Sequence, residues 1–405
     1  MFKHKLKGIV IHCSLAVGLL AVSLLPGIVQ AQGVEKVVEG NNRFAIDLFQ
    51  RVSTAQGGDN IFFSPLSLST ALSMTYAGSR GNTAKQMADT IHFGYGQEQF
   101  HQDYSRLLTA FSSDGKPYTL SMANALWGQD NYRFEQKFIS LIDNYYGGGF
   151  NKVNFVTQRE ESRQQINQWV AEKTSDKIKE LLRADDLSAD TRLVLTNAIY
   201  FKGKWTLPFN SAETLLQPFY IRPDEKVEVG MMRQTEKFRY VDTDEVQLIE
   251  LPYAGDELSM VVLLPKGSQG EFSNSLSTDK LQQWLAQSKE ERVAVFLPKF
   301  KLAARYYLEE EKFLPAMGMI DAFSKQDADF SDITGAKDLY IAHVIHQAAI
   351  EVNEAGSEAS AATAVVMDGK SFMPIFRADK PFLFMIMHKP TGAILFMGKV
   401  NNPEA

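Results

Sequence analysis

Cysteine is almost absent from this chain of 405 residues. The only one, Cys13, lies in an N-terminal segment that has the pattern of a leader, so the remainder of the chain has none. This absence excludes a small scaffold held together by disulfides, and it excludes a catalytic cysteine. About 370 residues can instead bury a core large enough to stabilise a fold. We therefore expect a globular protein held by hydrophobic packing.

Catalytic and metal-binding motifs are also missing. No Gly-x-Ser-x-Gly and no His-Glu-x-x-His occurs. Gly369–Ser371 resembles the end of a phosphate-binding loop, but Ala364 stands where that loop needs its first glycine. Ser277–Lys280 matches the Ser-x-x-Lys pattern of penicillin-binding enzymes, but this short pattern also arises by chance, and the stretch has the character of a helix start. His343 and His346 point to opposite faces of a predicted strand and cannot chelate one metal. We expect no enzyme, no metal and no cofactor.

An excess of basic residues is lacking as well. The net charge is −6, and removal of the three lysines of the leader brings it to about −9. An acidic chain is not expected to bind nucleic acid. No Asn-x-Ser/Thr sequon occurs, which together with the lack of cysteine fits an exported bacterial protein slightly better than a eukaryotic secreted one.

Residues 1–31 have the pattern of a signal peptide. Lys3, Lys5 and Lys7 form a positive start, residues 9–25 are apolar, and Val29–Ala31 is a small-x-small cleavage site. We expect cleavage after Ala31 and a secreted protein, extracellular or, in a Gram-negative bacterium, periplasmic. The alternative is a retained membrane anchor, because the apolar run is nearly long enough to span a bilayer.

The remaining chain, residues 35–405, predicts one α+β domain with large mixed β-sheets. Ser64 is a favourable N-cap and Pro65 a favourable first helical residue, so a helix should begin there and end before Gly78. Helices are expected at 35–52, 65–77, 82–92, 97–111, 134–146, 159–182 with an interruption near 174–175, 279–287 and 307–319. Strands are expected at 60–63, 118–126, 192–205, in a series within 226–265, at 293–300, and on both sides of residues 351–371.

The segment 351–371 is rich in Ala and Ser and is flanked by two apolar, strand-like stretches. A long loop tethered at both ends to a sheet is usually functional, although locally the pattern also fits a surface helix or linker. If this segment became a strand, its side chains would alternate between faces. One face would be small or apolar (Ser357, Ala359, Ala361, Thr363, Val365) and the other would carry the only charge (Glu358, Ser360, Ala362, Ala364).

Four stretches resemble the serpins, a family of serine protease inhibitors. EAGSEA from Glu354, followed by Ala361, Ala362 and Thr363, is similar to the hinge of the serpin reactive-centre loop. The others are NIFFSPLS from Asn60, LTNAIYFKGKW from Leu195 and ADKPFLF from Ala378. The resemblance covers about residues 37–403 and implies the serpin fold, with helices, mixed sheets and an exposed loop at about 354–378.

The resemblance also implies roles for individual residues. Ser64, Ser67, Asn197 and His346 would form a polar cluster, the shutter, where two central strands part, and Trp205 would lie at the breach, where the loop enters. Without the resemblance, His346 reads as an ordinary buried histidine. The hinge and insertion residues would be Glu354, Gly356, Ser357, Glu358, Ala359, Ser360, Ala361, Ala362 and Thr363, with insertion starting at Ser357.

Counting from the hinge, as the family does, places the attacked bond at Lys370–Ser371. A lysine there suits a trypsin-like protease, with Met367, Phe372 or Met373 as alternative positions for other proteases. The implied mechanism is suicide inhibition: the protease serine attacks the carbonyl of Lys370 and becomes acylated, and residues 357–366 insert into the sheet before deacylation. We expect a monomer with a serine protease as its partner and no heparin site, because Lys85, Arg106 and Lys116 are scattered. The alternatives are a non-inhibitory serpin acting as carrier or chaperone and, remotely, an exported hydrolase.

Overall fold

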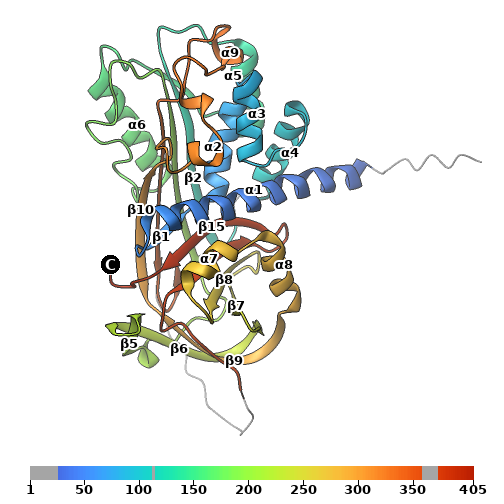
Figure 1. Cartoon of the computed structure of the whole chain (residues 1–405), viewed down its shortest axis with the longest axis vertical. Coiled ribbons are helices and arrows are strands. Elements are labelled where there is room, and N and C mark those ends of the chain that lie inside the picture. The colour runs from blue at the N-terminus through green and yellow to red at the C-terminus, as the bar shows by residue number, and fades with distance from the viewer. Residues whose placement is uncertain (1–25, 112–114, 358–372) are drawn as a thin grey trace, which may run out of the picture.

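The computed structural model describes residues 26–111, 115–357 and 373–405, with the side chains of 26–31 left out. Its helices are α1 Pro26–Gln56, α2 Pro65–Tyr76, α3 Gly81–Thr90, α4 Gln97–Ala110, α5 Gln136–Tyr146, α6 Arg159–Lys173, α7 Gln269–Ser275, α8 Thr278–Gln287 and α9 Ser331–Thr334. Helix α1 crosses the middle of the molecule, with α2 to α6 on one side and α7 and α8 on the other (Figure 1).

The strands form two sheets, which confirms the predicted α+β class with mixed sheets. The six-stranded sheet contains β10 Phe300–Tyr307, β11 His343–Val352, β4 Leu193–Lys204, β2 Tyr118–Gln129, β3 Phe150–Val153 and β12 Gly356–Ser357. The nine-stranded sheet contains β1 Ile61–Phe63, β15 Ala393–Val400, β14 Phe382–His388, β8 Leu258–Pro265, β7 Val246–Pro252, β6 Glu225–Asp242, β9 Lys289–Pro298, β13 Ile375–Arg377 and β5 Leu215–Arg222.

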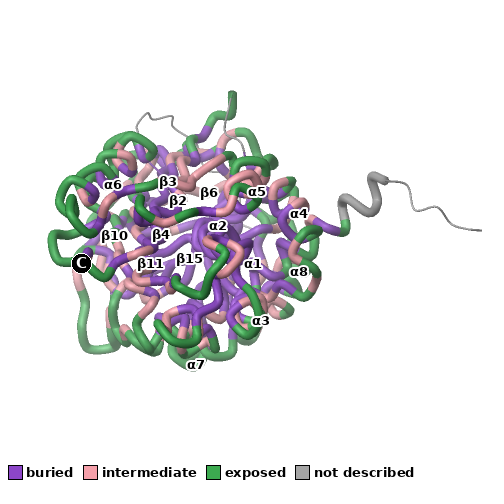
Figure 2. Tube along the Cα trace, turned by 90° about the horizontal axis from the view of Figure 1, so that it is seen from above, coloured by how far each residue is buried: buried purple, intermediate pink, exposed green. Residues whose placement is uncertain are grey.

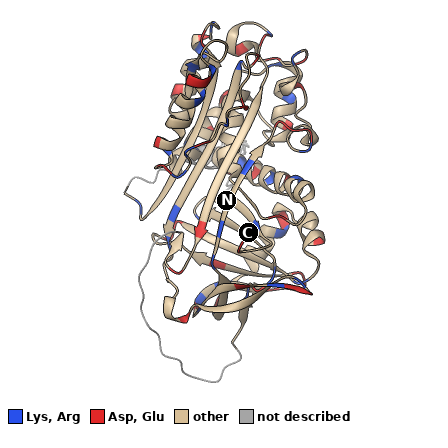
Figure 3. Ribbon diagram, turned by 90° about the vertical axis from the view of Figure 1, so that its left-hand side faces the viewer, with Lys and Arg blue, Asp and Glu red and all other residues tan. Residues whose placement is uncertain are grey.

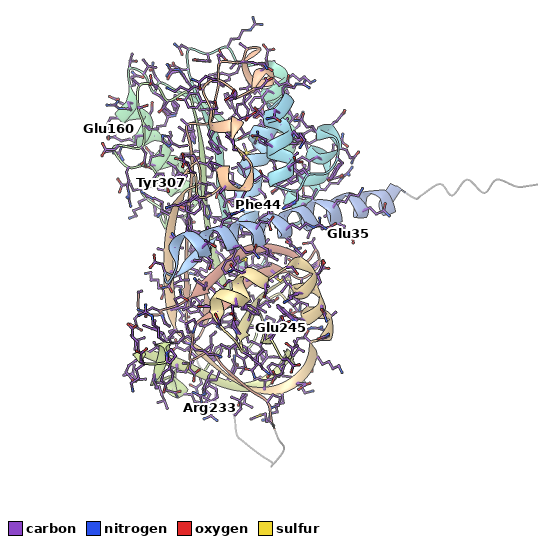
Figure 4. All side chains as sticks on the ribbon, in the orientation of Figure 1. Glu35, Phe44, Glu160, Arg233, Glu245 and Tyr307 are labelled. Carbon is purple, nitrogen blue, oxygen red and sulfur yellow. The ribbon has the colours of Figure 1, made fainter. Side chains whose placement is uncertain are left out.

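The core lies between these sheets and the helices, and buried residues fill the centre of the view in Figure 2. Phe44, labelled in Figure 4, lies in the middle of α1 and is fully buried. Strand β1 is buried along its whole length, and Phe62 stacks on Phe396 with ring centroids 5.5 Å apart. The long strands of the six-stranded sheet carry few charges along their middles (Figure 3). This packing keeps the central strands in an apolar environment.

Local signals placed the start of α2 correctly. Ser64 has an extended backbone, its hydroxyl accepts a hydrogen bond from the Ser67 amide, and Pro65 is the first helical residue. All twelve residues of α2 are buried, polar ones included. Buried hydroxyls require partners, and those of Thr70 and Ser73 donate to carbonyls one turn earlier. The predicted cap therefore starts a helix that lies entirely inside the protein.

Two helix predictions are wrong. Residues 307–319 are not a helix: β10 continues to Tyr307, which pairs with Ile345, and only Pro315–Met317 forms a short 3-10 turn before Gly318. After Tyr307 the chain forms turns, in which the Leu308 amide donates to the Val344 carbonyl and the Leu314 amide to the Leu308 carbonyl. Helix α6 also ends at Lys173 and does not resume, because Ser175 and Asp176 both adopt positive φ.

Helix α1 begins before the expected residue 35. Its backbone is helical from Pro26, so the predicted cleavage site at 29–31 lies within its first turns. Among the described residues, no helix is long and apolar enough to cross a membrane.

Candidate functional site

The candidate site lies where the parallel strands β4 and β11 stop pairing. Their register runs from His343 opposite Val194 to Ala349 opposite Tyr200. Beyond this point β11 continues to Val352 against β10 alone, and the chain then turns back and forms the short strand β12 against the end of β4. Gly356 then lies opposite Lys204 and Ser357 opposite Gly203, in antiparallel orientation. The first two residues of a strand therefore already occupy this end of the sheet.

The turn between β11 and β12 requires glycine at its last position. Gly356 adopts φ +137°, and a Cβ there would lie 2.2 Å from the carbonyl oxygen of Gly203. Backbone hydrogen bonds between Asn353 and Gly356 close the turn, at 2.9 and 3.2 Å. The Asn353 side-chain oxygen also accepts from the Ala355 amide at 3.1 Å. This explains the glycine in the hinge motif by geometry.

Ser357 is buried in this arrangement, with 1% of its surface exposed. Its hydroxyl oxygen lies 3.0 Å from that of Tyr253, whose pKa is raised because the ring is buried. Trp205 stacks on Tyr253 with centroids 4.6 Å apart. The indole nitrogen of Trp205 donates to the Asn353 carbonyl at 3.0 Å. Trp205 therefore lies directly against the turn that begins the loop.

Glu354 anchors the same turn on its other side. Its carboxylate accepts from Thr214 at 2.9 Å and pairs with Lys299 at 3.1 Å. Its carbonyl accepts from the Phe209 amide at 2.8 Å. Burial by itself would raise the pKa of Glu354, but hydrogen bonds from its own backbone, Thr214 and Lys299 lower it. The carboxylate is therefore held ionised at neutral pH.

A polar cluster joins β4 to β11 further along the sheet. His346 lies opposite Asn197 in the register, and both are fully buried. The Ser64 amide donates to His346 Nε2 at 3.0 Å, so Nε2 carries no proton and Nδ1–H donates to Asn197 Oδ1. The Asn197 amide nitrogen donates to Ser67 Oγ at 2.7 Å and to Asn124 Oδ1 at 2.6 Å. The structure thus brings together the four residues that the resemblance suggested for the shutter.

The cluster is electrically neutral. Burial lowers the pKa of His346 to about 3, because the charged imidazolium would lose its water. The Ser64 hydroxyl donates to the Leu395 carbonyl at 2.6 Å, which ties the start of α2 to β15. The hydrogen bond between His346 on β11 and Asn197 on β4 must be exchanged if the two strands separate.

Five functional contacts of this region were not predicted from the sequence. Tyr253, Thr214 and Lys299 approach the hinge from segments that are distant in the sequence, and no local signal indicates them. Asn124 was signalled only as a polar residue within an apolar strand, opposite Asn197. Asn353, which closes the turn, lies next to the hinge motif and resembles an ordinary turn residue.

Most of the predicted loop lies outside the described residues. This applies to Glu358, Ala359, Ser360, Ala361, Ala362, Thr363, Met367, Lys370, Ser371 and Phe372. Met373 is described and is partly exposed. Strand β13 then pairs parallel with β9, with Ile375 opposite Ala294. Within the part of the chain that the structure describes, no group of His, Cys, Asp and Glu could hold a metal ion.

Comparison with known proteins gives consistent results over nearly the whole chain. A sequence model of the family described as Serpin (serine protease inhibitor) matches residues 39–403. The chain is 39% identical over 382 residues to a leukocyte elastase inhibitor of Homo sapiens, which covers 91% of this chain and 100% of the relative. The corresponding protein of Xenopus laevis is 37% identical over 380 residues, with the same coverage. These vertebrate relatives do not support the bacterial-like part of the prediction.

Several solved structures resemble the fold over nearly the whole chain. Uncleaved ovalbumin matches with a TM-score of 0.82 at 30% identity, covering 91% of this chain and 100% of the ovalbumin chain. Maspin matches with a TM-score of 0.85 at 27% identity, covering 92% and 100%. Human thyroxine-binding globulin, in complex with thyroxine, matches with a TM-score of 0.82 at 28% identity, covering 92% of this chain and 99% of the globulin chain.

Proposed function

Because the chain belongs to the serpin family, we propose that it is a suicide inhibitor of serine proteases whose loop inserts between β4 and β11 after attack. The family is described as serine protease inhibitors, and the relatives compared above are named as inhibitors and not as enzymes. The protease serine attacks the carbonyl of the attacked residue, the peptide bond breaks, the new amine leaves with a proton, and the serine is left acylated by the inhibitor. Residues 357–366 then insert as a strand before water releases the acyl group.

One observation carries this proposal: Gly356 and Ser357 already pair with the end of β4 where β11 no longer does. Insertion would continue that strand along β4 and replace the direct pairing of β4 with β11. Each inserted residue adds ladder hydrogen bonds and buries small side chains on one face. The His346–Asn197 hydrogen bond lies across the path and must break as the strand advances.

We propose Lys370–Ser371 as the attacked bond and a trypsin-like enzyme as the target. The reason is charge: the specificity pocket of a trypsin-like protease contains an aspartate that pairs with lysine. The named elastase inhibitors among the relatives favour a second candidate, attack at Met367, Phe372 or Met373 by an elastase-like enzyme. A single loop can present both bonds, because the candidate positions lie within seven residues of each other.

The test incubates the protein with trypsin and, separately, with leukocyte elastase at near-equal concentration, followed by denaturing electrophoresis. A covalent band at the summed mass supports inhibition, and the mass of the released C-terminal peptide identifies the bond. Lys370→Ala should abolish the trypsin complex and leave an elastase complex, whereas the matched Met367→Ala variant should retain the trypsin complex. Cleavage by both enzymes without any covalent band would contradict inhibition and favour a carrier or chaperone role.

We also propose that residues 1–31 are removed and that the protein is secreted as a monomer. Cleavage after Ala31 would shorten α1 but keep its buried positions, such as Val37, Phe44 and Phe49. The N-terminal sequence of the protein recovered from the culture medium tests this, together with light scattering on the same sample. A start at Met1, or a mass twice that of the chain, would contradict the respective part.

A further inference from the structure

A cavity away from the loop has the features of a binding site for a small anion. It has a volume of about 400 Å³ and lies between the end of α1, helix α7, the β5 strand and the end of β15. In Figure 1 these elements meet on the side of the molecule that carries the C-terminus. Two of the residues that line it are cationic, Lys399 and Arg222, and none is acidic.

Lys399 is the unusual member of this cavity, because only 3% of its surface is exposed. Its ammonium group donates to the Gly57 carbonyl at 3.0 Å and to Ser53 Oγ at 3.5 Å. These contacts anchor the end of α1, but they use two of the three N–H groups. No carboxylate lies within ion-pair distance of Lys399 in the described part of the chain; Asp59 acts on it only from farther away. A buried charge without a counter-ion is costly, so an anion here would be stabilised.

Two further donors of the same cavity have no partner. Ser273 is 1% exposed, and neither its hydroxyl nor the side-chain nitrogen of Gln269 has a hydrogen-bond partner among the described residues. Both residues line the cavity beside Lys399. Native proteins rarely leave buried polar groups unsatisfied without a reason. A ligand oxygen would satisfy both groups.

Arg222 lies at the outer edge of the cavity and is largely exposed. Its contact with Glu225, at 3.0 Å, uses a single guanidinium nitrogen. The other nitrogens are free to approach a ligand without breaking that pair. Ile221 and Pro381 supply apolar surface beside it. Hydrogen-bond donors therefore line the inner part of the cavity with Lys399, and its outer edge combines the charged Arg222 with the apolar Ile221 and Pro381.

We propose that this cavity binds a small organic anion with a phosphate or carboxylate headgroup, held by Lys399, Ser273 and Gln269, with Arg222 at the entrance. An ammonium group, a hydroxyl and an amide N–H together donate to an oxyanion, and the charge of Lys399 favours an anion over a cation. The volume of the cavity exceeds that of inorganic phosphate, so the cavity has room for a small polar group attached to the headgroup. The site is separate from the hinge and does not depend on inhibition.

Isothermal titration calorimetry with inorganic phosphate and with citrate tests the proposal on the full chain. We expect saturable binding of at least one probe, and the better probe identifies the headgroup. Ser273→Ala and Lys399→Gln should each weaken that binding about tenfold or more, since each removes a hydrogen bond to a charged group. Ser273→Ala keeps the test valid if Lys399→Gln does not fold, because Ser273 has no side-chain partner to lose.

The matched control is Lys237→Gln, which removes an exposed lysine from β6 and should leave the affinity unchanged. Absence of saturable binding by both probes at millimolar concentration would overturn the proposal. Equal affinity in the wild type, Ser273→Ala and a folded Lys399→Gln would overturn it as well, because binding would then occur elsewhere.

Discussion

Replacing Ser357 with arginine should convert the inhibitor into a substrate. Ser357 is buried against Tyr253 and lies opposite Gly203 at the opening of the sheet. A guanidinium at this position must either be buried without a counter-ion, which costs several kcal/mol, or leave the sheet. Leaving is cheaper, because it gives up the Tyr253 hydrogen bond, about 1 kcal/mol, and the ladder bonds of two residues. We therefore expect a folded protein whose hinge lies outside the sheet.

The kinetic effect follows from the competition between insertion and deacylation. To insert, the variant must drag the charged side chain through the opening, which raises the barrier to insertion by about 3 kcal/mol or more. Each 1.4 kcal/mol is a factor of about ten in rate, so about a hundredfold more inhibitor is cleaved per enzyme trapped. The assay measures residual protease activity against inhibitor concentration and the covalent band on a denaturing gel. Fluorescence of Trp205, which contacts the turn, reports release of the hinge.

The matched control is Ser357→Ala, which removes the Tyr253 hydrogen bond but keeps a small apolar side chain. The number of inhibitor molecules cleaved per enzyme trapped should rise by less than about tenfold, because this variant loses only about 1 kcal/mol. If Ser357→Arg traps protease as efficiently as the wild type, residues from 357 onward do not enter the sheet. The mechanism proposed above would then be wrong.

Three further perturbations test the shutter and the hinge. Asn197→Ala leaves the buried Nδ1–H of His346 without an acceptor, whereas Ser67 and Asn124 keep their hydrogen bond to each other. The free energy of unfolding in urea should therefore fall by roughly 1–3 kcal/mol, and polymers should form faster on native gels; no change in either would contradict a role of this cluster in holding β4 and β11 together. Burial lowers the pKa of His346 to about 3 and that of His101 to about 4, so the unfolded chain binds more protons below pH 6.5 and stability should fall between about pH 6.5 and 3, by up to about 1.4 kcal/mol per pH unit per histidine. His346→Gln should show a shallower slope, and an identical slope would refute this assignment. Glu354→Gln removes the ion pair with Lys299, in which the Lys299 side chain is 46% exposed and that of Glu354 only 16%. Stability should fall by roughly 1–2 kcal/mol while hydrogen exchange at the amides around the turn accelerates; unaltered exchange would show that the carboxylate does not anchor the turn.

The amino-acid sequence by itself determined the local structure and the character of the site. Ser64 and Pro65 specify the start of α2 through capping and a preset backbone angle, both of which act within one turn. Alternating and continuous apolar runs placed the strands around the loop, because burial of one or both faces requires those patterns. The missing cysteines and catalytic motifs excluded whole classes of function. The hinge motif indicated where a strand could be added.

Tertiary structure decided which distant residues meet. Residues 307–319 carry helical spacing, yet Tyr307 pairs with Ile345 as the last residue of β10. The Leu308 amide then donates to the Val344 carbonyl, and turns follow where the helix was predicted. Asn124 joins Asn197 only because β2 and β4 pair in one register. Ser357 is already buried because Tyr253 and the end of β4 provide a place for it. Such contacts depend on packing across the whole fold, and the local sequence contains no signal that would predict them.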